Sequence, residues 1–254
     1  MYLWKYWRDT RRGVFVYLGV LVWVVFFLMY SFHRANRLHY IGSDPLILWA
    51  MTVEITFSFV YLCAIVMGLV LGTSNVGSDF AKGTAEFLLT RTRSRRHFIW
   101  TGWLTGMAEL FGLMVFTGTV VIVATSSITG PVWRNVPSPF RFHVDQDVVD
   151  IPKMALAAVL MAALVFGLTY FMSVLLKSSQ RGVIGSIGIL VGYLGVNAIL
   201  KVLWGYSLPV LDFMERSAPS GAWHIGPQTA MLGWALLSLA FPFAAQLVFD
   251  RVDI

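Results

Sequence analysis

The stretch MALAAVLMAALVFGLTYFMSVLL, residues 154–176, decides the fold class of this chain because it carries no charged side chain. A helix needs about 20 apolar residues to span the hydrocarbon core of a membrane, and this stretch meets that length. Five further apolar stretches occur at residues 14–32, 46–71, 103–125, 183–204 and 229–249. The sequence therefore predicts an all-α integral membrane protein with six transmembrane helices.

The composition of the whole chain supports a membrane protein. Its 254 residues are 57% hydrophobic and 13% charged, with a mean hydropathy of +0.72, whereas soluble domains carry about 25% charged residues. The longest polar segments, 72–102, 126–153 and 205–228, are each too short to bury a core of their own. We therefore expect residues 1–254 to form a single multi-pass domain in the cell (cytoplasmic) membrane.

The Lys and Arg residues are distributed unevenly between the two sides of the predicted domain. Of the 19, twelve lie in the N-terminal segment, residues 72–102, residues 177–182 and the C-terminal tail, and seven lie on the opposite side. Because cytoplasmic loops carry an excess of Lys and Arg, both termini are predicted to be cytoplasmic. Cationic loops that face anionic lipid also account for the net charge of +6 without a nucleic-acid partner.

The N-terminal segment, MYLWKYWRDTRRG at residues 1–13, has an amphipathic pattern. At helical spacing Leu3, Trp4 and Trp7 share one face, and cations that include Arg8 share another. Such a segment is expected to lie in the membrane interface as an elbow helix, with its indole rings at headgroup depth. It either anchors the chain to the membrane or carries motion from a partner into the first span. The span that follows is too long for a signal peptide and lacks a cleavage site, so we expect it to be retained.

The predicted cytoplasmic loop 72–102 contains a short helix signal. Thr84 can cap a helix, and Glu86 in its first turn is favourable to the helix dipole. Leu88 and Leu89 supply an apolar side, and Gly83 allows a tight turn just before the cap. A basic cluster follows. From the residues alone, the loop is either a helix that meets a partner or a cationic loop that meets lipid headgroups.

This loop resembles the first cytoplasmic loop of type-2 ATP-binding-cassette (ABC) exporter permeases. The residues that carry the resemblance are Asp79, Gly83, Thr84, Glu86, Leu88, Leu89, Ser94 and Arg95. The chain departs from the family pattern at Ala85, where Leu is usual, and at Thr92, where Pro is usual. The likeness in sequence is confined to this loop, whereas the likeness in topology extends over the whole chain.

The resemblance implies a function and a set of partners. The loop would form a coupling helix that docks on a separate ATPase subunit, with two ATPase copies in the assembly. The chain would be the permease of an exporter and would form a homodimer or pair with a similar permease. The connection at 205–228 would re-enter the outer leaflet as a broken helix.

No ATP site is recognisable in this chain. A phosphate-binding loop needs a lysine after its second glycine, and the nearest approach, at residues 72–79, lacks it. We therefore expect the chain to be non-catalytic and to bind no cofactor, with ATP and Mg²⁺ held by the partner ATPase. No metal site is expected either.

Two acidic residues lie inside the predicted spans, Glu54 and Glu109. A carboxyl group is costly in hydrocarbon, so each is expected to face a pathway, an interface or a polar partner. They leave open a proton-coupled secondary transporter or a channel as the alternative to the ABC permease. An intramembrane enzyme is a further alternative, although the sequence contains neither an H-E-x-x-H nor a G-x-S-x-G motif.

The fifth predicted span carries a stripe of glycines. They follow Gly182 at helical spacing on one side of the helix: Gly185, Gly188, Gly192 and Gly195. Glycine stripes permit close approach between the backbones of neighbouring helices. The stripe is expected either to pack within one subunit or to form a subunit interface that slides when a pathway opens.

Overall fold

The protein is described from a computed structural model. The residues that the structure describes are 2–37, 45–74, 79–80, 83, 95–129, 141–144, 147–205, 214–216, 223–225 and 228–251. Six long helices dominate them: α1 (Tyr2–Arg37), α2 (Pro45–Ser74), α5 (Arg95–Thr129), α6 (Ile151–Leu175), α7 (Ser179–Trp204) and α8 (Gln228–Arg251). Each predicted span falls inside one of these helices, apart from Leu176, which follows the end of α6, and this confirms the helical class.

Five of the helices, α1, α5, α6, α7 and α8, contain apolar stretches long enough to cross a membrane. In α2 the apolar stretch found among the described side chains, Phe59–Ser74, is shorter than a full span. These long apolar helices identify a multi-pass membrane protein. A sixth crossing by α2 stays a prediction, as does the cytoplasmic location of the termini.

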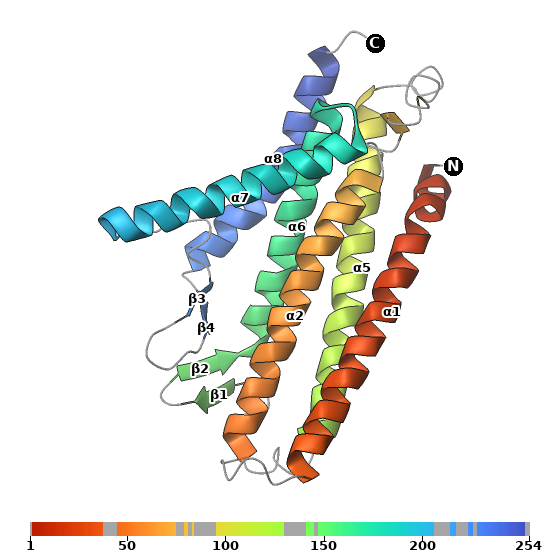
Figure 1. Ribbon diagram of the computed structural model, residues 1–254. Helices are drawn as coiled ribbons and strands as arrows, with labels where there is room; N and C mark the ends of the chain where they lie inside the picture. Colours follow the sequence, from red (N-terminus) through yellow and green to blue (C-terminus); the bar gives the residue numbers. More distant parts are fainter. Residues whose placement is uncertain are drawn as a thin grey trace.

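Both chain termini lie at the same end of the bundle, which we call the terminal end (Figure 1). The end of α2, the start of α5, the α6–α7 turn and the end of α8 lie at this end too (Figure 1). Two antiparallel strands of four residues each, β1 (Arg141–Val144) and β2 (Asp147–Asp150), lie toward the opposite end. The arrangement agrees with a chain that crosses an even number of times.

The connection before α8 is described in part. It contains the antiparallel strands β3 (Met214–Arg216) and β4 (Trp223–Ile225), whereas the largely apolar residues 208–213, for which a broken re-entrant helix was expected, lie outside the described residues. In these strands Met214 pairs with Ile225 and Arg216 with Trp223. Residues 214–216 and 223–225 are therefore not helical, and a re-entrant helix in the preceding segment stays a prediction.

The N-terminal segment differs from its prediction. A separate elbow helix was expected at residues 1–13, but α1 is one continuous helix from Tyr2 to Arg37. Its 36 residues make it about 54 Å long, well beyond the hydrocarbon thickness. Gly13 does not break it, because a single glycine inside a helix costs only about 1 kcal/mol. A Cβ atom on Gly13 would lie in ordinary contact with α2, 3.5 Å from Val70 Cγ1.

Helix α6 is the centre of the bundle and contacts α2, α5, α7 and α8. Of its apolar span, 72% is buried, against 6% for α7. Helix α2 approaches α6 closely, because Gly68 and Gly72 face the α6 backbone. An added Cβ would lie 2.8 Å from the Ala162 carbonyl oxygen at Gly68 and 2.9 Å from the Phe166 carbonyl oxygen at Gly72. Small residues permit this packing, which dispersion forces stabilise in a membrane.

Buried polar contacts join the remaining helices. Tyr17 of α1 and Thr117 of α5 share a hydrogen bond of 2.7 Å between their hydroxyl groups. Tyr170 of α6 donates its hydroxyl to the carbonyl oxygen of Ile99 in α5, also at 2.7 Å. In hydrocarbon such bonds hold helices in register, because a hydroxyl without a partner loses free energy there.

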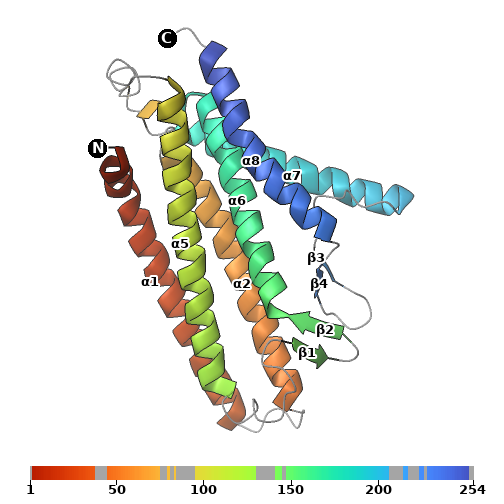
Figure 2. The ribbon, with the colours of Figure 1, turned by 180° about the vertical axis from the view of Figure 1, so that it is seen from behind.

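Helix α7 projects away from the other helices (Figures 1 and 2). It begins at Ser179 after the capping residue Ser178, and it ends where Gly205 adopts a left-handed conformation with φ of 63°. Most of its large apolar side chains are exposed, as Val202 illustrates at 84%. This helix therefore presents apolar surface to lipid or to another protein.

Candidate functional site at the terminal end

The beginning of the predicted coupling loop is anchored in the terminal end of the bundle. Asp79 is completely buried, and it and Phe80 are helical. The ring of Phe80 meets Phe249 of α8 edge-on, with 5.8 Å between ring centroids. Phe249 in turn stacks at 6.2 Å on Phe98 of α5. Phe80 therefore contacts α8 directly and is linked to α5 through Phe249.

Gly83 forms a tight turn after this anchor. Its N–H donates to the carbonyl oxygen of Phe80 at 3.1 Å, and its φ is +67°. An added Cβ would meet no other group, so the need for glycine here is conformational: L side chains disfavour this φ. The turn lies where the sequence pattern placed one.

The helical part of the predicted coupling loop lies outside the described residues. This applies to five of its predicted residues: Thr84, Glu86, Leu88, Leu89 and Ser94. Arg95, the last predicted residue, begins α5. The structure thus describes how the loop leaves the bundle at Asp79–Gly83 and how it returns at Arg95.

A cleft of about 900 Å³ lies beside this loop. It is lined by Phe80 and by the α6–α7 turn from Leu175 to Arg181. Lys177 and Arg181 contribute exposed cations. The hydroxyl oxygen of Ser178 accepts a hydrogen bond from the backbone N–H of Arg181 at 3.5 Å. A cleft of this kind can receive a projecting, acidic element of another protein, because its cations are accessible from water.

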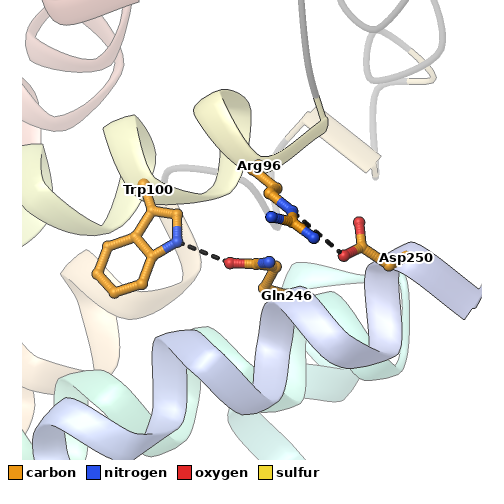
Figure 3. Close-up of polar contacts among 4 residues, drawn as sticks. All are labelled: Arg96, Trp100, Gln246 and Asp250. Atoms are coloured by element: carbon orange, nitrogen blue, oxygen red, sulfur yellow. Dashed lines mark hydrogen bonds and ion pairs between the residues drawn. The ribbon is translucent and has the colours of Figure 1, made fainter.

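Two polar contacts connect α5 and α8 next to the anchor (Figure 3). The indole Nε1 of Trp100 donates to the side-chain oxygen of Gln246 at 2.8 Å. One turn away, Arg96 Nε lies 3.8 Å from Asp250 Oδ2. Our sequence analysis did not single out these residues. The signal was present, since each helix carries its two polar or aromatic partners four residues apart, on one face.

The structure joins two sets of residues that the sequence analysis kept apart. Trp7 of the predicted elbow and Glu109 of the predicted pathway line the same groove between α1 and α5, which measures about 630 Å³. Thr10 of α1 donates its hydroxyl to Glu109 Oε1 at 3.1 Å. Arg8 is exposed and does not line this groove. The side chains of Trp4 and Glu54 lie outside those that the structure describes.

The glycine stripe of α7 divides into two parts. Near the turn it packs on α6, since a Cβ on Gly185 would lie 2.7 Å from the terminal methyl of Met172. Farther along, Gly188, Gly192 and Gly195 face open space. Packing within one subunit therefore accounts for the first part of the stripe only. The glycine pair that brings two helices together within this subunit, Gly68 and Gly72 in α2, was missed in the sequence.

Within the described ranges, no three side chains of His, Cys, Asp and Glu gather closely enough to hold a metal ion. The arrangement of the terminal end is suited to a mechanical contact. It combines a buried anchor, a glycine turn, an accessible cationic cleft and aromatic contacts that lead into α5 and α8.

The helices define the chain as a multi-pass membrane protein, and comparison with known proteins places it in a family. Residues 16–254 match the family described as "Protein of unknown function (DUF2705)", and the chain belongs to this family. No curated protein and no solved structure matches the chain.

Proposed function

We propose that this protein is the permease subunit of an ATP-driven ABC exporter, coupled to a separate ATPase subunit through the loop at Gly83–Arg95. The resemblance of this loop to the coupling loop of type-2 exporter permeases is the starting point. The structure adds a physical route by which a push on the loop could act on the helices.

The observation that carries the proposal is the position of Phe80. Its ring contacts Phe249 of α8, and it also lines the cleft at the α6–α7 turn. Phe249 extends the contact to Phe98 of α5. A displacement of the loop would therefore shift α5, α8 and the α6–α7 turn together, because close-packed side chains transmit strain.

The mechanism that follows is alternating access. Closure of the ATPase dimer on ATP and Mg²⁺ would move the loop and favour one arrangement of the helices over another. The driving force would be the different affinity of the ATPase for the two arrangements. This chain would contribute no catalytic residue to ATP hydrolysis.

A second permease copy, or a similar permease, would complete the pathway. The part of α7 that carries Gly188, Gly192 and Gly195 supports such a pairing. Its glycines are open, and the helix projects from its own bundle (Figure 2). Small residues let two helix backbones approach closely in a membrane.

Affinity purification of the tagged chain from its own host tests the proposal. We expect an ATPase subunit to be recovered in stoichiometric amount with the wild-type chain. Phe80→Ala should reduce that recovery several-fold, because the loop loses its anchor. Phe111→Ala, which removes an exposed ring from α5, is the matched control. Recovery of the wild-type chain alone from several mild detergents would contradict the proposal.

Glu109 supports a second candidate function, a proton-coupled secondary transporter. Its carboxyl group lies within a helix that can span a membrane and has Thr10 as a hydrogen-bonding partner. Intramembrane carboxyl groups are common in proton pathways. Dissipation of the proton gradient at constant ATP distinguishes the two functions. It would stop a proton-coupled transporter and leave an ATP-driven exporter active.

A further inference from the structure

The groove between α1 and α5 has the size and lining of a small-molecule site. Its volume is about 630 Å³, and ligand sites typically fall between about 300 and 1,000 Å³. Trp7 contributes from α1, and five residues contribute from α5: Thr101, Leu104, Thr105, Ala108 and Glu109. Most ligand sites share this composition, a largely apolar wall with a few polar groups.

Only one of the two carboxyl oxygens of Glu109 has a hydrogen-bond partner among the described residues. Its Oε1 accepts the hydrogen bond from Thr10 at 3.1 Å. Its Oε2 is buried and has no hydrogen-bond partner within the described part of the chain. A buried polar atom without a partner is unfavourable, and a negative charge is more so. The second oxygen is therefore suited to a partner from outside the chain.

The other polar groups of the groove also favour a cation. Thr105 donates its hydroxyl to the Thr101 carbonyl oxygen at 2.7 Å, so its own oxygen remains available as an acceptor. The indole of Trp7 is the aromatic ring whose face binds cations best. Arg11 and Arg12 on the same helix are exposed and do not line the groove.

The groove lies at the edge of the apolar spans. Trp7 precedes the α1 span Thr10–Phe27, and Glu109 lies inside the α5 span Arg96–Val120. Leu104, on the groove wall, is 56% exposed, so the groove opens to the lipid side. The ligand must therefore combine a charge with an apolar body.

We propose that this groove binds a lipophilic cation, an ammonium or phosphonium group carried on an apolar body. The cation pairs with Glu109 Oε2, and the apolar body lies against Leu104 and Ala108. The ligand is either a free amphiphilic molecule or the amine headgroup of a lipid. The site stands on the groove alone and does not depend on ATP-driven export.

Binding of tetraphenylphosphonium to the full chain in lipid nanodiscs tests the site. Tetraphenylborate, of the same shape and opposite charge, is the matched probe. We expect wild-type protein to bind the phosphonium ion at least ten-fold more tightly than Glu109→Gln, which keeps an acceptor for Thr10 but removes the charge. Leu104→Trp, which fills the groove and leaves the carboxyl group in place, should weaken binding to a similar degree.

Two further measurements complete the test. Thermal unfolding of each variant verifies that it is folded, and Glu109→Asp, which retains the charge, should retain most of the binding. Phosphonium binding that is equal in wild-type, Glu109→Gln and Leu104→Trp protein would overturn the proposal, as would equal binding of tetraphenylborate.

The lipid composition distinguishes the two sources of the cation. In phosphatidylglycerol nanodiscs, added phosphatidylethanolamine competes with tetraphenylphosphonium if an amine lipid occupies the groove. Glu109-dependent binding that phosphatidylethanolamine does not reduce assigns the groove to free amphiphilic cations. Either result supports the site, whereas absence of phosphonium binding to the wild-type protein in both membranes contradicts it.

Discussion

The indole N–H of Trp100 donates to the side-chain oxygen of Gln246 at 2.8 Å, joining α5 to α8 beside the anchor of the predicted coupling loop. The two residues are 146 positions apart in the chain. Phe243, one turn from Gln246, packs edge-on against the same indole at 4.9 Å. The hydrogen bond and the ring contact together hold α5 against α8 at the terminal end.

Loss of this hydrogen bond is expected to destabilise the protein. Gln246→Leu leaves the Trp100 N–H without its acceptor, and we expect a loss of about 1 kcal/mol in the free energy of unfolding. A double-mutant cycle with Trp100→Phe, measured by unfolding in detergent, isolates the interaction. The neighbouring pair supplies the control. Arg96→Ala should change stability by less than about 1 kcal/mol, because its side chain is 71% exposed. Equal effects at both pairs would contradict this ranking.

The close contact between α2 and α6 should not tolerate a larger residue. A Cβ on Gly72 would lie 2.8 Å from Thr169 Cβ, and overpacking of this kind typically destabilises by about 1–3 kcal/mol. Gly72→Val is therefore expected to lower the unfolding temperature clearly. Gly19→Val in α1, of the same size at a position where an added Cβ meets nothing, is the matched control. A similar loss of stability in the two variants would contradict this account of the contact between α2 and α6.

The turn at Gly83 tests the coupling role separately from stability. Ala in the left-handed conformation costs roughly 1–2 kcal/mol, whereas Asn adopts it more readily. We expect Gly83→Ala to reduce the recovery of a partner ATPase and Gly83→Asn to preserve most of it, with both variants remaining folded. Equal recovery of the ATPase with the wild type and both variants would show that ATPase binding does not depend on this turn.

The predicted orientation can be tested by thiol labelling. Cys63 is the single cysteine and is buried, so Cys63→Ala provides a chain without thiols. Lys177→Cys, in the α6–α7 turn, should react with a membrane-impermeant maleimide only after the cells are opened. Lys201→Cys, near the far end of α7, should react in intact cells. Both positions are exposed, and labelling of both from one side would contradict a crossing by α7.

Much of the fold could be predicted because it rests on local properties of the chain. A run such as residues 154–176 has no stable place except inside a membrane or a core, whatever its neighbours are. The turn at Gly83 is local as well, since it depends on the φ preference of one residue. The prediction of a separate elbow helix was wrong because an amphipathic pattern does not determine where a helix ends. Neither Gly13 nor any proline interrupts α1.

The sequence by itself determined the apolar helices and therefore the membrane class, because length and hydrophobicity act within each segment. Only the tertiary structure decided which faces meet. It placed Gly68 and Gly72 against α6 and left Gly188 without a contact inside the chain, although all three are glycines within predicted membrane spans. It also joined Thr10 to Glu109, 99 positions away. Such contacts depend on the packing of whole helices, because in a membrane each helix pair is selected by the fit of its surfaces.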